Sequence, residues 1–208
     1  VSFHVNGQAV NSQQNAKTPL AQVLREEMAL TGTKTFCESG ACGSCTVHIN
    51  NKPHSSCTMP LYKVAGQRVT TVEGLKQEEL HPVQQAFIDA DALQCGFCTP
   101  GMVMAAAAFV DGYKQKFPRQ TPTKVEISQA MAGNLCRCGA QPQILKAIQS
   151  CFGKTKALLE DAIPRHDAFD KVTGAAEYAF DYYPQGLLHA AVLRATHASA
   201  QVKELNIE

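Results

Sequence analysis

Residues 37–45 read CESGACGSC and place Cys37, Cys42 and Cys45 on one nine-residue loop. A fourth cysteine, Cys57, follows after eleven further residues. A C-x4-C-x2-C pattern with a distant fourth cysteine is the ligand spacing of plant-type [2Fe-2S] clusters. Zinc sites usually show two short knuckles with two ligands in each. The loop therefore predicts a [2Fe-2S] site, with zinc and disulfides as the alternatives.

The segments around this loop predict a small α+β domain. Residues 2–10 alternate around an Asn-Gly pair, and residues 45–53 around an Asn-Asn pair, which are signals of two-stranded hairpins. Between them we expect one helix, with Thr18 as its N-cap and Gly32 as its stop. Two hairpins crossed by one helix form an α+β domain over residues 1–75, with the cysteine loop near one edge.

A second set of four cysteines has a different spacing. Cys95 and Cys98 form a C-x2-C pair, and Cys136 and Cys138 form a C-x-C pair 37 residues further on. A disulfide between Cys136 and Cys138 is unfavourable, because it would close a very tight ring and remove little chain entropy. These thiols therefore need another partner.

Each pair of the second set stands directly before a predicted helix. Thr99-Pro100 caps and opens one helix, and Gln141-Pro142 precedes another. With two further helical stretches, residues 76–155 are predicted to form a four-helix domain. An oxidised cluster held by four thiolates is anionic, and the positive N-terminal ends of helices stabilise anions. The four cysteines Cys95, Cys98, Cys136 and Cys138 are predicted to hold a second [2Fe-2S] cluster.

Composition narrows the class of protein. The chain has 208 residues, 45% of them hydrophobic and 18% charged, with a formal net charge of +1. These values do not favour binding to nucleic acid or to an acidic membrane surface. No apolar run is long enough to span a bilayer and no export signal is visible, so we expect a soluble, cytoplasmic protein. Nine cysteines in a chain of this length fit an intracellular metal protein better than a disulfide scaffold.

Zinc binding and thiol redox chemistry are the other interpretations of the cysteines. A lone C-x2-C motif often binds zinc or belongs to a thioredoxin-like protein. The βαβ pattern that accompanies the thioredoxin motif is not predicted here. A zinc-stabilised interaction module stays open as an alternative from the spacing alone.

Residues 1–155 closely resemble the iron–sulfur portion of the molybdenum hydroxylases, the xanthine dehydrogenase and aldehyde oxidoreductase family. The matching stretches are CESGACGSCTV, SSCTMPL, QCGFCTPGMVM and GNLCRCG. The resemblance implies a ferredoxin-like β-grasp domain followed by an all-α four-helix domain. It also implies that each domain holds one [2Fe-2S] cluster.

The resemblance further implies contacts with a molybdopterin cofactor. In the family, the cluster of the helical domain lies nearest the pterin. By position, Cys138 would lie beside the pterin amino group and Gln94 would hydrogen-bond the pterin. Residues 139–141 read Gly-Ala-Gln where the family usually has Thr-Gly-Tyr, which leaves the ligands intact. No residue of this chain is expected to have a catalytic acid–base role.

Residues 162–208 resemble the opening of the large molybdenum-binding subunit of the same family, through the stretches KVTGAAEY and LLHAAVLRATHASAQV. Residues 156–208 are thus expected to form a connector and the first strands of an incomplete molybdenum-binding domain. The expected partner is a large molybdenum-bearing polypeptide, or the remainder of the same chain. A FAD subunit or another electron acceptor would take the electrons. The start at Val1 hints at trimming, and removal of an export signal would place the protein in the periplasm instead.

The predicted function is the electron-transfer portion of a molybdenum hydroxylase. Such an enzyme oxidises an aldehyde or an N-heterocycle such as a purine with oxygen derived from water. The alternatives are a free-standing carrier with two clusters and the zinc-stabilised module. By this resemblance, the pocket that selects the substrate is expected to lie beyond residue 208.

Overall fold

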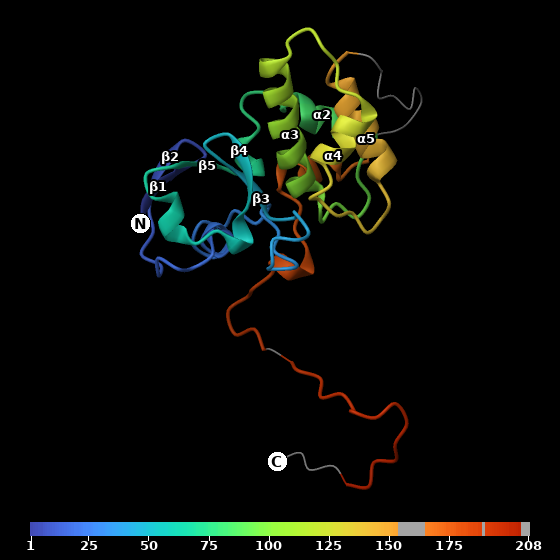
Figure 1. Cartoon of the computed structure of the whole chain (residues 1–208). Coiled ribbons are helices and arrows are strands. Elements are labelled where there is room, and N and C mark those ends of the chain that lie inside the picture. Colours follow the sequence, from blue (N-terminus) through green and yellow to red (C-terminus); the bar gives the residue numbers. More distant parts are fainter. Residues whose placement is uncertain (154–164, 189, 205–208) are drawn as a thin grey trace.

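The protein is described by a computed structural model that covers residues 1–153, 165–188 and 190–204. A sheet domain comes first and a helical domain follows it (Figure 1). A C-terminal segment passes both domains and then extends away from them (Figure 1). The α+β class and the order of the two domains are as predicted.

The sheet domain holds five strands in the order β2-β1-β5-β3-β4. Strands β1 and β2 pair antiparallel, as do β3 and β4, so both predicted hairpins are confirmed. Their turns use left-handed residues at Asn6-Gly7 and Asn50-Asn51, as tight hairpin turns require. The central strand β5 runs parallel to β1 and antiparallel to β3, which makes the sheet mixed. The strands are β1 Ser2–Val5, β2 Gln8–Asn11, β3 Thr46–Ile49, β4 Lys52–Ser55 and β5 Arg68–Thr70.

The helix of the sheet domain is shorter than the sequence predicts. It comprises α1, Leu20–Gln22, which continues as one π-helical stretch, η1, Val23–Glu27. The predicted N-cap at Thr18 is wrong, because Pro19 keeps an extended backbone with ψ of 136° and itself occupies the N-cap position. The predicted stop at Gly32 is also wrong.

The helix ends early because Ala29 adopts a left-handed φ of 55°. Gly32 instead lies in a close contact: a Cβ atom there would stand 2.8 Å from the Cα atom of Gly174. The helix buries one face against the sheet, where Leu20, Leu24 and Val47 are fully enclosed.

The four predicted helices of the second domain are all present. His81 caps the first of them: its ring accepts a hydrogen bond from the Val83 amide. The predicted cap at Thr99 of the next helix is wrong, because Thr99 lies within the first turn and Cys98 is the N-cap. The helices are α2 Pro82–Asp89, α3 Thr99–Lys116, α4 Lys124–Ala130 and α5 Gln141–Ser150.

Helix α3 packs across strand β3 and joins the two domains (Figure 1). The His48 ring on β3 lies 2.7 Å from the carbonyl oxygen of Met104 on α3. Burial lowers the pKa of His48, so the ring is neutral and donates this hydrogen bond. Gly101 allows the closest approach, because a Cβ atom there would stand 2.3 Å from the carbonyl oxygen of Gly43. The first cysteine loop is thus pressed against the start of α3.

The C-terminal segment contains helix α6, Ala168–Thr173, and one 3-10 turn, η5, Ala179–Asp181. The stretch LLHAAVLRA, residues 187–195, belongs to the segment expected to form the first strands, but its described residues form no strand and are exposed. No strand of a molybdenum-binding domain is found among residues 165–188 and 190–204. The expected connector, residues 151–163, lies outside the described residues from residue 154 onward. Within the described chain, no helix combines the length and apolarity needed to cross a membrane.

Candidate metal centres

The first cysteine set gathers at the edge of the sheet domain that faces the helices. Cys37, Cys42 and Cys45 lie on the loop before β3, and Cys57 lies in the 3-10 turn η2, Ser56–Thr58. The Cys42 amide donates to the Cys37 sulfur at 3.4 Å, and the Cys57 amide to the Cys45 sulfur at 3.5 Å. Cys42, Cys45 and Cys57 are buried and Cys37 is half-buried. The structure therefore brings these four residues together.

The pKa values of the thiols in the first set indicate that this site needs positive charge to hold four thiolates. Hydrogen bonds from Ser39 lower the pKa of the Cys37 thiol to about 6. Burial raises the pKa of the Cys57 thiol to about 12, and the adjacent Cys45 thiol adds to the shift. Four thiolates are stable in such a pocket only when metal ions neutralise them.

Two glycines of the first cysteine loop adopt left-handed backbone conformations. Gly40 and Gly43 have φ values of +78° and +72°, which residues with a Cβ atom rarely adopt. The amides of Cys42 and Cys57 donate to sulfurs of the set, as an anionic cluster requires. The donor set and the amide-lined loop fit a [2Fe-2S] cluster.

The second set assembles from two loops of the helical domain. Cys95 and Cys98 precede α3, while Cys136 and Cys138 precede α5. A backbone hydrogen bond from Cys95 lowers the pKa of Cys138. Burial raises the pKa of Cys98 to about 12, and the neighbouring Cys136 adds to this. The pKa values of Cys95, Cys98 and Cys138 are thus each influenced by a neighbouring thiol of the set, so the four cysteines lie close together.

The two sets differ in their exposure. Cys95 and Cys138 are exposed, and Gln94 beside them is exposed as well.

All nine cysteines are free thiols. Among the described residues, no three or more His, Cys, Asp or Glu side chains surround one metal-ion position. A [2Fe-2S] cluster needs a different arrangement, since its four cysteines are shared between two irons.

A short link between the two sets was not predicted. The Leu135 amide donates to the carbonyl oxygen of Cys42 at 2.9 Å, and Leu135 is bonded to Cys136. The adjacent Asn134 side chain donates to the Gly43 carbonyl, also at 2.9 Å. Ninety-one residues separate Asn134 from Gly43, so no local pattern announces this pairing.

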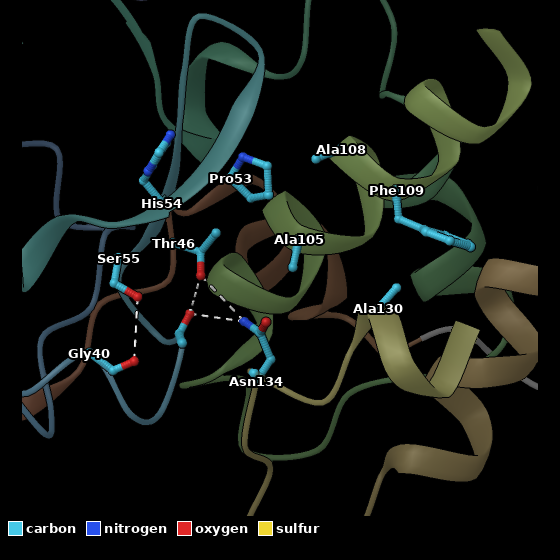
Figure 2. A pocket seen from close by; sticks show the side chains of 12 residues that line it. Gly40, Thr46, Pro53, His54, Ser55, Ala105, Ala108, Phe109, Ala130 and Asn134 are labelled. Carbon is cyan, nitrogen blue, oxygen red and sulfur yellow. Dashed lines mark hydrogen bonds between the residues drawn. The ribbon is translucent and has the colours of Figure 1, made fainter. Parts of the chain in front are cut away.

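A cleft of about 400 Å³ lies beside this link, between β4 and the helices (Figure 2). Gly40 and Ser55 line it from the sheet domain, and the Ser55 hydroxyl lies 3.5 Å from the Gly40 carbonyl. Ala105 and Phe109 of α3 and Asn134 line the opposite side (Figure 2). The cleft leaves the first cysteine loop accessible from one side.

Fold and sites together define a class: a two-domain protein with one four-cysteine site in each domain. Two family descriptions match it, "2Fe-2S iron-sulfur cluster binding domain" over residues 7–93 and "[2Fe-2S] binding domain" over residues 71–149. The chain therefore consists of two [2Fe-2S]-binding domains and a C-terminal segment.

Comparison with known proteins shows which proteins of this class the chain is similar to. One subunit of the nicotinate dehydrogenase of Pseudomonas putida is 43% identical over 150 residues, which cover 72% of this chain and 92% of the relative. The crystal structure of quinoline 2-oxidoreductase from Pseudomonas putida 86 matches with a TM-score of 0.65 and 40% identity, over 72% of this chain and 89% of that one. Aldehyde oxidoreductase from Desulfovibrio desulfuricans matches with a TM-score of 0.75 and 32% identity, over 86% of this chain but 21% of that one.

The chain belongs to the family of iron–sulfur subunits and portions of molybdenum hydroxylases, which includes aldehyde oxidoreductase, xanthine dehydrogenase and nicotinate dehydrogenase. Its role in such an enzyme is electron transfer.

Proposed function

We propose that the eight cysteines of the two sets bind two [2Fe-2S] clusters that carry electrons away from a molybdopterin site. Hydroxylation of a substrate C–H group by water releases two electrons and two protons. A [2Fe-2S] cluster takes one electron at a time. Two clusters in series can therefore carry the two electrons one after the other. Electrons enter at the second site, which is formed by Cys95, Cys98, Cys136 and Cys138. They pass to the first site, formed by Cys37, Cys42, Cys45 and Cys57, and then leave to an external acceptor.

Exposure supports this order. Gln94, Cys95 and Cys138 lie at the surface, where a cofactor held by another polypeptide can reach them. We assign Gln94 and Cys138 to contact with the pterin, Gln94 through its side-chain amide. The first set is mostly enclosed, and the cleft beside Gly40 offers an acceptor one route of approach.

The link between Cys42 and Leu135 is the observation that carries the proposal. Electron tunnelling falls off less steeply through covalent and hydrogen bonds than through empty space. From a cluster bound at Cys42, the path runs through the Cys42 carbonyl and one hydrogen bond of 2.9 Å to the Leu135 amide. It then reaches Cys136 along the backbone. A short bonded route between the two sites supports electron transfer from one to the other.

The substrate class and partner follow from the relatives. Their names include a nicotinate dehydrogenase, a quinoline oxidoreductase and aldehyde oxidoreductases. We propose an aldehyde or an N-heterocycle as the substrate, bound by a molybdenum-bearing polypeptide. Leu188, Val192 and Leu193 are 92%, 79% and 98% exposed, and such apolar side chains are usually covered by a partner. A free-standing carrier would leave them in water. Eight thiols committed to metal fit the reducing cytoplasm.

Two matched variants of the assembled enzyme test the electron path. Cys98→Ser removes a ligand of the second site and Cys57→Ser removes a ligand of the first. The enzyme is mixed with benzaldehyde or nicotinate, and electron paramagnetic resonance (EPR) follows each cluster. In the Cys57→Ser enzyme, substrate should still reduce the second cluster. In the Cys98→Ser enzyme, substrate should no longer reduce the first cluster, although dithionite still does.

The half-buried Cys151 provides the control, and Cys151→Ser should leave both clusters reducible by substrate. Rapid reduction of the first cluster by substrate in the Cys98→Ser enzyme would contradict the proposed order. Full iron content in both ligand variants would contradict the ligand assignment itself.

A further inference from the structure

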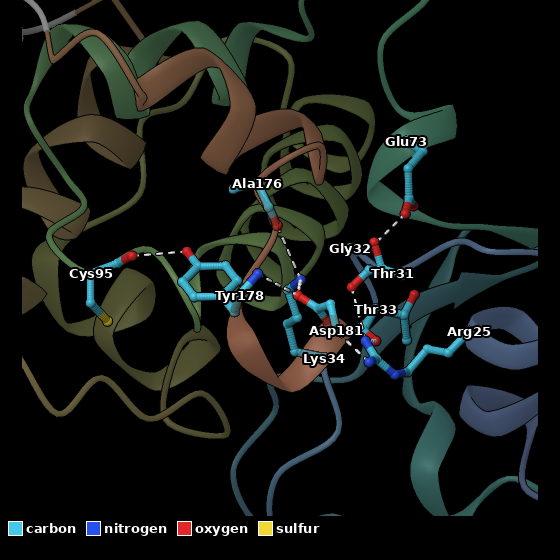
Figure 3. Close-up of polar contacts among 10 residues, drawn as sticks. All are labelled: Arg25, Thr31, Gly32, Thr33, Lys34, Glu73, Cys95, Ala176, Tyr178 and Asp181. Carbon is cyan, nitrogen blue, oxygen red and sulfur yellow. Dashed lines mark hydrogen bonds and ion pairs between the residues drawn. The ribbon is translucent and has the colours of Figure 1, made fainter. Parts of the chain in front are cut away.

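The C-terminal segment over residues 165–181, here called the strap, lies on the loop that carries Cys95 (Figure 3). The Tyr178 hydroxyl donates to the carbonyl oxygen of Cys95 at 2.8 Å. The Tyr178 side chain therefore reaches a residue 83 positions earlier in the chain. This contact joins the strap directly to a ligand peptide of the second site.

A second strap residue binds the neighbouring peptide group. The Lys171 ammonium donates to the carbonyl oxygen of Gln94 at 2.8 Å. Its side chain is 10% exposed, and it also forms an ion pair with Asp167 at 2.6 Å. A nearly buried positive charge thus stands one residue from Cys95. Asp167 is more exposed than Lys171. Solvent therefore screens the negative charge of Asp167 more strongly than the positive charge of Lys171.

The strap and the loop interlock in shape as well. Gly96 has φ of +87°, and a Cβ atom there would stand 2.5 Å from Lys171 and 2.6 Å from the Tyr178 hydroxyl. The next residue, Phe97, contacts Tyr178 and Phe180 edge-to-face, with ring centroids 5.4 and 6.0 Å apart. Every residue from Gln94 to Phe97 is therefore in contact with the strap.

Both ends of the strap are fixed to the domains beneath it. On the helical domain, Ala168 and Val172 are buried in the core, and the Gln84 side chain donates to the Val172 carbonyl at 2.9 Å. On the sheet domain, Asp181 accepts a hydrogen bond of 2.5 Å from Lys34 (Figure 3). Arg25 approaches the other oxygen of Asp181 to 2.9 Å. Tyr178 and Lys171 are thus held in place from two sides.

We propose that Tyr178 and Lys171 are positioning residues that hold the Cys95 loop in its ligand conformation and raise the reduction potential of the second cluster. This inference rests on the proposed function, since it assumes a cluster at that site. Reduction adds one negative charge to the cluster. Hydrogen-bond donors and a cation beside the ligand peptide stabilise that charge and favour the reduced state.

Redox titration of the full chain with its clusters, followed by EPR, tests the inference. Tyr178→Phe removes the hydroxyl and keeps the ring, while Lys171→Gln removes the charge and keeps the length. Tyr182→Phe is the matched control, because Tyr182 is 70% exposed. The first cluster serves as an internal reference within each sample. The signals are assigned with the Cys57→Ser and Cys98→Ser variants.

The expected result is specific to one cluster. In Tyr178→Phe and in Lys171→Gln, the second cluster should shift to a more negative potential or lose its share of the iron, while the first cluster stays as in the wild type. Tyr182→Phe should change neither cluster.

The inference is overturned if both clusters keep the wild-type potential and iron content in both variants, or if both clusters change alike. Failure of the proposed function looks different, because the wild-type chain itself would then lack a second one-electron signal.

Discussion

At the scale of single residues, Asp181 is a buried carboxylate that pairs with two cations. Its carboxylate side chain is 2% exposed and stands between Lys34, whose side chain is fully enclosed, and Arg25, at 8%. Burial lowers the pKa of Lys34, while the hydrogen bond to Asp181 opposes this change. The Lys34 ammonium also lies 4.8 Å from the centre of the Tyr178 ring. One carboxylate thus compensates two buried cations and fixes the strap.

Replacing Asp181 should therefore cost more than replacing one of its partners. Asp181→Ala removes the carboxylate that pairs with both Lys34 and Arg25, and we expect the free energy of unfolding to fall by about 3–5 kcal/mol. Lys34→Met keeps the pair between Asp181 and Arg25 and should cost clearly less. Urea unfolding followed by circular dichroism measures both values. Equal losses in the two variants would show that the carboxylate does not serve both cations.

At the scale of elements, helix α3 organises both sites. Its first turn follows Cys98, so the second site sits at its N-terminal end. The same turn carries Gly101, against which the first cysteine loop packs. The positive end of one helix is thereby close to both anionic sites. Close approach at Gly101 is what allows a single helix to serve two sites.

Two glycines of α3 offer a matched pair of substitutions. Alanine is the better helix former, so Gly112→Ala should stabilise the protein by about 1 kcal/mol, because a Cβ atom there meets open space among the described residues. Gly101→Ala should destabilise it despite the same propensity gain, because its Cβ atom would stand 2.3 Å from the Gly43 carbonyl.

Thermal unfolding of the two variants decides this point. The Gly101→Ala protein should unfold at a lower temperature than the wild type, and the Gly112→Ala protein at a higher one. Stabilisation by both substitutions would mean that the two domains do not touch at this turn.

The same elements show which parts of the structure were predictable. The hairpins and helices follow from local signals such as Asn6-Gly7, which sets its turn whatever surrounds it. Contacts between distant segments carry no such signal. The bond from Leu135 to Cys42 uses only backbone atoms, which any residue type supplies. Tyr178 lies 83 residues from its partner Cys95, and Lys34 lies 147 residues from its partner Asp181. These contacts depend on the position of the strap, which no local sequence pattern predicts.

At the scale of the whole molecule, the sheet domain, the helical domain and the strap together hold the two cysteine sets. The sheet domain encloses the first cysteine set, the helical domain presents the second at its surface, and the strap ties the two domains together. Beyond the strap, the described residues extend into solvent with exposed apolar side chains (Figure 1). The arrangement suits a polypeptide that conducts electrons for a reaction carried out elsewhere.

Metal and sulfide analysis of the purified chain, combined with EPR of its reduced form, tests the central claim most directly. Two [2Fe-2S] clusters require about four iron and four acid-labile sulfide per chain, with two distinct one-electron signals. We expect this stoichiometry in the wild type, halved by either Cys57→Ser or Cys98→Ser. A folded chain that holds zinc without labile sulfide, or that pairs its cysteines as disulfides, would contradict it.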